Sequence, residues 1–302
     1  MSAGFQLRIA CPLLLTVSAL SGQQLEPQAY SVAPVGVNAT VFSFSTMDGD
    51  VSFDPTLPIE DVKTVLNRYD LGYFRSINFF GRSGSVAAVL PYTEGDTEGV
   101  VSGSFEQIRR SGLRDPAVRF AVNLLGAPAM SLGQFANYRQ KWIIGASFVV
   151  AAPLGQYDPA RLINTGTNRW SFKPEIGVSR TIGRWTLELI AGVWLFTDNN
   201  DFLGTKRTQD PIGASQIHVV YTFRPRLWAS FNVNFYTGGR TTVGGVLRAD
   251  LQRNSRIGGM VSIPIAKRHS IKAGYSAGAY TTIGADHRSI SVAYQFLWGG
   301  GL

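Results

Sequence analysis

The stretch SISVAYQFLWGGGL, residues Ser289–Leu302, closes the chain and alternates between two kinds of side chain. One set of alternate positions is large and apolar or aromatic, namely Ile290, Val292, Tyr294, Phe296 and Trp298. The other set is mostly small or polar. Successive side chains of a β-strand point to opposite faces, so this pattern predicts a strand with one apolar face. Because a terminal strand frays easily, the fold has to supply both a partner for it and an apolar environment for that face.

The same alternation recurs along most of the 302-residue chain. In WSFKPEIGV (residues 170–178), for example, the aromatic and aliphatic side chains share one face and the charged ones share the other. About twelve such segments can be marked, and most approach the roughly 9–11 residues that a tilted transmembrane strand needs. They lie near residues 35–45, 69–80, 85–92, 118–125, 142–152, 170–178, 184–195, 216–223, 227–235, 255–265, 270–278 and 289–302.

The connections between these segments alternate between long and short. The short ones are 81–84, 181–184, 224–226 and 266–269, and the long ones are 46–68, 93–117, 153–169, 198–210 and 237–253. Two gaps depart from the alternation, since 126–141 is long and 282–287 is short. Bacterial outer-membrane barrels pair long extracellular loops with short periplasmic turns, whereas a β-sandwich has no reason to do so. We therefore predict an all-β fold, a single antiparallel transmembrane β-barrel of about twelve strands with both termini on the periplasmic side.

The tight turns also predict how neighbouring strands pair. With RPR (224–226) as a turn, His218 would face Asn232, and apolar and polar pairs would fall on separate faces. The TIGR turn (181–184) gives a similar sorting, with Val178 near Leu187. Arg75 is the exception, because it falls on the apolar face of residues 69–80. An arginine facing lipid at the bilayer midplane costs roughly 2–4 kcal/mol, so we expect a bulge or the opposite register there.

Two segments have helical features instead. Residues 131–142 (SLGQFANYRQKW) predict a short turn-and-helix piece. Residues 57–69 (LPIEDVKTVLNRY) could form a loop helix, with Pro58 early and acidic residues near its start. No segment after the N-terminal region has 18 consecutive apolar residues, which excludes a further transmembrane helix by hydropathy.

The N-terminal stretch predicts export. It carries one positive charge at Arg8, an apolar run from Ile9 to Leu20, and small residues near Ser21. We interpret residues 1–22 as a signal peptide and residues 23–302 as the barrel. A signal-anchor helix is the alternative, although the run is short for a bilayer. The only cysteine, Cys11, would leave with the signal peptide, so the mature chain would have no disulfide or cysteine-based site. The expected location is the bacterial outer membrane.

Composition and motifs narrow the function classes. Charged residues make up 16 % and aromatic residues 12 %, which suits an outer surface that does not face water. The net charge of +8 comes partly from basic residues in tight turns, so we expect no nucleic-acid partner. We find no metal-ligand spacing, phosphate-binding loop or nucleophile elbow, and predict no catalytic residue, metal or cofactor. The spacing of His287 and Ser289 matches an outer-membrane phospholipase, but no asparagine follows it, and we predict that the protein is not an enzyme.

Two sets of polar residues are candidates for function. The first would line the lumen and set selectivity, and consists of Lys173, Glu175, Glu188, His218, Asn232, Asn234, Arg256 and Lys272. The second would surround an extracellular mouth, and consists of Asp54, Asp115, Gln156, Tyr157, Asp158, Asn164 and Asn168. For both sets a purely structural role has more weight than a functional one. Polar residues commonly form a solvated wall, and Asp-Pro, Asn and Gly commonly form turns.

Several stretches resemble one known family. They include RSGLRDPAVR (110–119), PLGQYDPARLINTGTNRWSFKPEIGVSR (153–180), FTDNNDF (196–202), YTGGRTT (236–242) and the final YQFLWGG (294–300). Together they are similar, over nearly all the mature chain, to the outer-membrane transporters named for the meta-pathway of phenol degradation. The resemblance implies a barrel that takes up phenol-like or other hydrophobic molecules, and it carries no catalytic residue.

We therefore expect an outer-membrane channel for passive uptake of small hydrophobic or aromatic compounds. Solutes would be captured at the loops and pass a narrow, partly plugged lumen without energy coupling, and no segment is recognisable as a plug domain. The alternative is a non-transporting barrel with a structural, adhesive or assembly role. The expected partners are outer-membrane lipid, the solute and the barrel-assembly machinery. Tyr294, Phe296 and Trp298 resemble the C-terminal signal that this machinery recognises, although GGGL follows the last aromatic residue.

Overall fold

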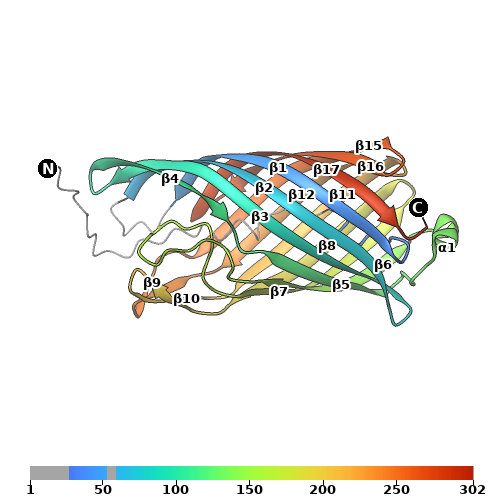
Figure 1. The fold of residues 1–302 in the computed structure, drawn as a ribbon, viewed down its shortest axis with the longest axis horizontal. Helices are drawn as coiled ribbons and strands as arrows, with labels where there is room; N and C mark the ends of the chain where they lie inside the picture. Colours follow the sequence, from blue (N-terminus) through green and yellow to red (C-terminus); the bar gives the residue numbers. More distant parts are fainter. Residues whose placement is uncertain (1–26, 53–58, 302) are drawn as a thin grey trace.

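A computed structural model describes residues 27–52 and 59–301 of the chain. Within these residues, twelve antiparallel strands close into one barrel, which confirms the predicted fold class (Figure 1). The barrel strands are β1 (Val37–Ser52), β2 (Ile59–Phe79), β3 (Arg82–Val101), β5 (Ala117–Leu125), β6 (Trp142–Ala151), β7 (Ser171–Ile182), β8 (Trp185–Phe196), β11 (Ile212–Arg224), β12 (Leu227–Gly238), β15 (Gln252–Ala266), β16 (His269–Tyr280) and β17 (Gly284–Gly299).

The last strand closes the barrel on the first. β17 pairs with β1 from Val37 opposite Gly299 to Ser52 opposite Gly284, so the terminal strand has a neighbour on both sides. Its apolar set faces outward, because Ile290 and Val292 remain 56 % and 48 % exposed. Outward hydrophobic side chains and buried polar ones are the arrangement that a barrel in lipid requires. The alternation of apolar and polar residues in the C-terminal stretch is therefore explained by a closed sheet whose outer face is apolar.

Aromatic side chains form clusters near both ends of the outer wall. Phe44, Tyr69 and Tyr92 follow one another across β1, β2 and β3, with ring centroids 5.2 and 6.2 Å apart. At the other end, Trp298 of β17 lies 5.5 Å from Phe296 and 6.2 Å from Tyr73. Aromatic girdles at the two membrane interfaces are typical of outer-membrane barrels. Among the described residues, no helix is long and apolar enough to cross a membrane.

Short and long connections separate to opposite ends of the barrel, as predicted. Helix α1 (Leu132–Asn137) and the C-terminus lie at the end with the short turns, which we call the turn end (Figure 1). The helix confirms the prediction for residues 131–142, and the Ser131 side chain caps it by accepting from the Gln134 amide. Short turns of outer-membrane barrels face the periplasm, so the expected periplasmic side is the turn end.

The opposite end, which we call the long-loop end, contains more strand than predicted. β1, β2 and β3 run past the barrel, and β4 (Ser104–Leu113) pairs with β3 in a projecting hairpin, so the predicted loops 46–68 and 93–117 are largely strand. β9 (Asn199–Phe202), β10 (Thr205–Gln209), β13 (Thr241–Val243) and β14 (Val246–Leu247) form a separate sheet over this end. Backbone pairing explains this, since long hairpins can satisfy their own hydrogen bonds outside the membrane.

The helix predicted for residues 57–69 is wrong. Residues 57 and 58 lie outside the described residues, and from Ile59 onward the chain is strand β2. Burial alternates there with period two, because Val62 and Thr64 are buried while Lys63 and Val65 are exposed. β1 and β3 pair with this segment on both sides. Two backbone ladders outweigh the local helix-start signal of an early proline and acidic residues.

The predicted pairing holds at one turn and is shifted at the other. His218 pairs with Asn232 and Tyr221 with Ala229, as the RPR turn predicts. Across the TIGR turn, Val178 pairs with Leu189 rather than Leu187, a shift of two residues. A two-residue shift keeps every side chain on its own face, so the sorting of polar and apolar residues survives it.

The bulge or reversed register expected at Arg75 is also wrong. β2 pairs with β3 without irregularity from Lys63 to Phe79, and Arg75 faces outward and is exposed. Arg75 pairs with Asn38, the second residue of β1, and the neighbouring Tyr73 contacts Trp298. Arg75 therefore lies close to the turn end, where a long side chain reaches the membrane surface and the midplane penalty does not apply.

Candidate functional site in the barrel lumen

Polar side chains fill the inner face of the barrel. Among the predicted lumen residues the structure buries Lys173, Glu175, Glu188, His218, Asn232, Asn234 and Arg256, and it leaves Lys272 half-buried beside a cavity. Each occupies an inward position of its strand, alternating with outward apolar residues. Sequence periodicity therefore gives their direction correctly, but it does not say which of them meet.

One half of the lumen holds a segment that the sequence did not identify. Residues 27–36 precede β1 and run inside the barrel against β5–β8. The backbone amide of Gln28 donates to Glu188 Oε2 at 2.6 Å, and Arg119 Nη1 donates to the Ala29 carbonyl at 3.1 Å. Asn123 Nδ2 donates to the Tyr30 carbonyl at 3.2 Å. Two barrel strands, β5 and β8, thus hold the backbone of this N-terminal segment.

Tyr30 anchors the N-terminal segment by its side chain. The ring is 5 % exposed, and it packs with Ala121, Ile143 and Ile190. Arg119 lies over the ring at 5.1 Å from its centroid, and the Tyr30 hydroxyl lies 3.2 Å from Ser147 Oγ. The anchor thus combines apolar burial, a cation–π contact and a hydrogen bond.

Two glycines make room for this ring. Gly145 of β6 and Gly177 of β7 are paired opposite each other and face inward. A Cβ on either residue would lie 2.2 Å from a carbon of the Tyr30 ring. Glycine inside a strand often marks the close approach of another segment, so the aligned pair is the signal that could have revealed the N-terminal segment.

An ion network lies beneath the ring. Glu175 accepts from Ser147 Oγ at 3.0 Å, and its carboxylate lies 2.9 Å from Lys173 Nζ and 3.7 Å from Arg119 Nε. Lys173 also lies 4.9 Å from the centre of the Trp194 ring. Buried charges persist in proteins when they are paired and hydrogen-bonded, and these are. Two of the predicted lumen residues, Lys173 and Glu175, therefore stabilise the wall that carries the N-terminal segment.

Other predicted lumen residues contact side chains that carry no formal charge. His218 Nδ1 lies 2.8 Å from Asn232 Oδ1, and its Nε2 lies 3.1 Å from Gln216 Oε1. Asn234 Nδ2 donates to the Tyr236 hydroxyl at 2.7 Å. These side chains are fully buried, so this strip of β11 and β12 is a closed polar wall.

Among residues 27–52 and 59–301, the other half of the lumen contains a cavity. A cavity of about 300 Å³ lies against β1, β2, β12 and β15–β17, and we call it the lumen cavity. It is lined by small side chains such as Ser276, Ser289 and Ser291, together with the backbone of Gly274. Arg68, Asp70, Arg256 and Lys272 contribute the charges. Small residues at successive inward positions of β16 and β17 leave this space unfilled, whereas the N-terminal segment fills the space beside β5–β8.

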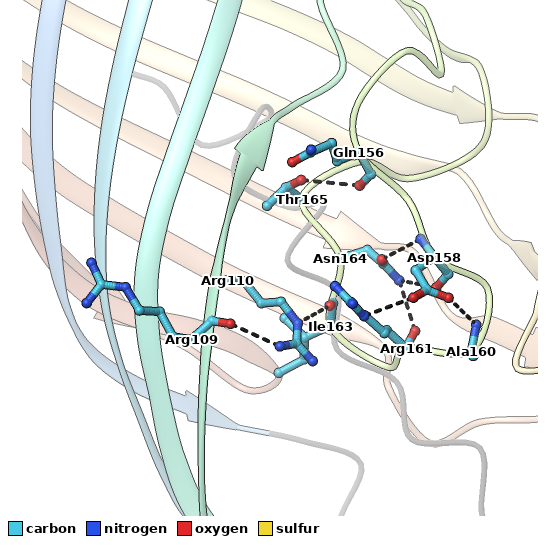
Figure 2. Close-up of polar contacts among 9 residues, drawn as sticks. All are labelled: Arg109, Arg110, Gln156, Asp158, Ala160, Arg161, Ile163, Asn164 and Thr165. Atoms are coloured by element: carbon cyan, nitrogen blue, oxygen red, sulfur yellow. Dashed lines mark hydrogen bonds and ion pairs between the residues drawn. The ribbon is translucent and has the colours of Figure 1, made fainter.

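The predicted mouth residues lie in the loop between β6 and β7 and next to it. Figure 2 shows Asp158 and Asn164 turned toward the loop's own backbone and side chains, and the Gln156 backbone carbonyl accepting from Thr165. Asn164 Oδ1 accepts from the Asp158 amide at 2.8 Å, and Asp158 forms an ion pair with Arg161 at 2.9 Å. Arg110 of β4 donates to the Ile163 carbonyl at 3.1 Å. These contacts hold the loop in place.

The remaining mouth residues are engaged in the same way. Asp115 accepts from the amides of Gly155 and Thr167 at 2.9 and 3.0 Å, and from Thr167 Oγ1 at 2.5 Å. Asn199 contacts both Tyr157 and Asn168, and burial raises the pKa of the Tyr157 hydroxyl. Asp54 lies outside the described residues. The described mouth residues therefore stabilise the conformation of the loops.

Comparisons with known proteins agree with this architecture. A COG4313 outer membrane channel from Pseudomonas putida F1 superposes with a TM-score of 0.77 at 18 % identity, covering 91 % of this chain and all of that one. The β domain of the Bordetella autotransporter BrkA gives 0.52 at 12 % identity, over 87 % and 100 % of the two chains. The translocator domain of NalP from Neisseria meningitidis gives 0.51 at 11 % identity, over 92 % and 95 %. These likenesses show that the fold is that of outer-membrane barrels.

The sequence itself identifies the family. No curated protein matched the chain. A family model described as "Putative MetA-pathway of phenol degradation" matches residues 48–296, which include most of the barrel and the loops described above. The chain therefore belongs to this family of outer-membrane barrels.

Proposed function

We propose that the protein is a channel for passive entry of small hydrophobic or aromatic solutes across the outer membrane. The observation that carries the proposal is the division of the lumen into a filled half and a cavity of about 300 Å³. A cavity at the lower end of the size range of small-molecule sites suits a single-ring solute better than a large one. The family description, which refers to phenol degradation, supports the same class of solute.

The filled half determines what the channel excludes. The N-terminal segment and the Lys173–Glu175 network occupy the side of β5–β8, so the path for a solute lies along β1, β2 and β15–β17. A narrow path lets a solute of one ring through and holds back larger ones. Passage down a concentration gradient needs no energy coupling. The predicted lumen residues Asn232, Arg256 and Lys272 would line the path, whereas His218 and Asn234 would belong to the closed wall.

Export and assembly belong to the same proposal. Residues 1–22 would direct export as a signal peptide, and Tyr294, Phe296 and Trp298 would form the signal that the barrel-assembly machinery reads. Support for the second role comes from their position, since all three lie in the strand that closes the barrel.

Uptake in cells is the appropriate test, because small aromatic solutes cross plain liposomes unaided. Radiolabelled phenol would be measured entering a Gram-negative strain that makes the protein, against the same strain making variants. Ser291→Phe places a ring in the lumen cavity, and Val292→Phe places the same ring on the lipid face of the same strand. We expect Ser291→Phe to reduce uptake to the level of the empty strain and Val292→Phe to leave it unchanged. Equal uptake by all strains, with the barrels folded, contradicts the proposal.

A non-transporting barrel is the second candidate, and one observation favours it. The Tyr30 anchor and the ion network of Arg119, Lys173 and Glu175 seal one half of the lumen with packed and paired side chains. Such packing would serve a structural or assembly role as well as a channel. This candidate gains if planar bilayers containing the protein conduct no ions and cells containing it take up no phenol.

A further inference from the structure

The lumen cavity carries an excess of positive charge. Arg68, Arg256 and Lys272 line it together with one carboxylate, Asp70, a formal charge of +2 (three minus one) with His287 neutral. Arg68 and Asp70 form their own ion pair at 2.7 Å. The unbalanced charge therefore belongs to Arg256 and Lys272, which come from the adjacent strands β15 and β16.

Lys272 has no counter-charge in the described part of the protein. Its cross-strand neighbours are Ser262 and Ala293, and it forms no ion pair within 4.0 Å. The other inward lysine, Lys173, lies 2.9 Å from the carboxylate of Glu175, two residues along the same strand. Shielding an ammonium group from water without a partner is costly, and proteins usually avoid it. The contrast between the two lysines indicates that Lys272 is set to meet a negative charge that comes from outside the chain.

Arg256 is only partly engaged. It is 3 % exposed, and its Nη2 donates to Ser276 Oγ and to the His287 carbonyl, both at 3.0 Å. Its Nη1 has no hydrogen-bond partner. The Asp286 carboxylate lies above Gly278, the residue opposite Arg256, but at more than ion-pair distance from the guanidinium. Arg256 therefore retains both charge and donor capacity.

The rest of the lumen cavity is small or apolar. Met47 and Met260 line it with Ala273 and Ala293, and methionine adapts to ligands of varied shape. A site with adaptable apolar walls and two cations fits a molecule with an apolar body and an anionic head. Carboxylate is an anion that lysine and arginine bind with charge-assisted hydrogen bonds.

We propose that the lumen cavity is a binding site for small amphiphilic carboxylates, with Lys272 and Arg256 holding the carboxylate and the methionines contacting the apolar body. This inference rests on the proposed function and specifies its solute class, extending it from neutral aromatic compounds to aromatic and aliphatic acids. A bound carboxylate would supply the counter-charge that Lys272 and Arg256 lack, whereas a neutral solute would leave both cations unpaired.

Calorimetric titration of the purified full-length protein in a non-ionic detergent at low salt tests the site. Phenylacetate and phenylacetamide share size and ring and differ in charge. We expect phenylacetate to bind roughly tenfold or more tightly than the amide, since hydrogen bonds to charged groups contribute about twice what neutral ones do. Lys272→Gln should abolish this difference and leave amide binding unchanged, and Lys272→Arg should restore it. Lys267→Gln, which removes the same charge from an exposed turn, should change nothing.

Two results overturn the proposal. Equal affinity of the wild-type protein for the acid and the amide does so without any variant, and so does equal acid binding by Lys272→Gln and Lys267→Gln. If a Lys272 variant fails to fold, Arg256→Gln with the same pair of probes decides the question. The experiment also separates this site from the channel function. Carboxylate binding without phenol uptake would refute the channel function and support the binding site. Phenol uptake without preferential binding of the acid would support the channel function and refute the binding site.

Discussion

Filling the space beneath Tyr30 should release the N-terminal segment from the lumen. A Cβ at Gly145 or at Gly177 would lie 2.2 Å from the ring, at Cδ1 and Cε2, respectively, against 3.4–4 Å in an ordinary contact. The ring would have to retreat by at least about 1.2 Å, the difference between 3.4 and 2.2 Å. The two positions press on opposite edges of the ring, so it can only move away from the wall. That movement strains the Tyr30 contact with Ser147 and the hydrogen bond from Asn123.

The magnitude follows from the cost of overpacking. Extra methyl groups in a packed site cost about 1–3 kcal/mol, which corresponds to a roughly 5- to 160-fold shift of an equilibrium. In the double variant Gly145→Ala/Gly177→Ala we expect hydrogen–deuterium exchange at the Gln28 and Ser31 amides to accelerate by a factor in this range. Both amides are hydrogen-bonded in the docked segment, to Glu188 and to the Gln28 carbonyl. Planar-bilayer conductance should rise in the same variant, because half of the lumen empties.

A glycine with room around it provides the control. Gly72 is a strand glycine of β2, but a Cβ there would make an ordinary contact of 3.5 Å with Val41. Gly72→Ala should therefore leave both exchange and conductance at the wild-type level. Unchanged exchange at Gln28 and Ser31 in the double variant, with a folded barrel, would refute the claim that the glycine pair holds the N-terminal segment in place.

Three further predictions concern the barrel and its loops. Deleting Tyr294–Leu302 removes the partner of the first six residues of β1, and we expect no heat-modifiable barrel in outer-membrane fractions, whereas deleting only the last three residues should permit insertion. Asp115→Ala removes three hydrogen bonds from the β6–β7 loop, and a hydrogen bond to a charged group contributes roughly 1.5–3 kcal/mol. Limited proteolysis should therefore cut the loop faster than in Asp201→Ala, which changes an exposed side chain. Arg75→Leu should change the free energy of unfolding in lipid by less than about 1 kcal/mol. Leu71→Arg, nearer the middle of the same outward row, should lower it by roughly 2–4 kcal/mol. Equal effects of the two variants in urea titrations would contradict the position given to Arg75.

The fold could be predicted because a barrel repeats one local rule. Each strand separates polar from apolar residues with period two. A barrel closes when an even number of such strands pair in sequence and the last pairs with the first. Val178 shows how tolerant the rule is, since a pairing error of two residues left every side chain on its own face. The helix proposed over residues 57–69 failed because local start signals say nothing of the β1 and β3 ladders on either side.

The site was less predictable because it depends on which inward residues meet across the lumen. Lys173 and Lys272 have the same place in the alternation, yet one is ion-paired and the other is not. Lys173 has an acidic residue two positions along on its own strand, Glu175, whereas the inward neighbours of Lys272 on β16 are Ser270 and Gly274. The sequence of the N-terminal segment has no hydrophobic periodicity. The pairing of Gly145 with Gly177 is the sequence feature that indicates its position in the lumen.

The seam between β1 and β17 has a kinetic consequence. It joins Val37 to Gly299, nearly the full length of the described chain, so it is the contact with the greatest loop-closure entropy and should form last. The N-terminal segment is attached directly to β1, one edge of that seam. While the seam is open, the segment can settle on β5–β8 from the side, and once the seam closes it can leave only through an end. The order of assembly thus decides whether the finished barrel encloses its own N-terminal segment, and a barrel that closes too early would be trapped with that segment outside.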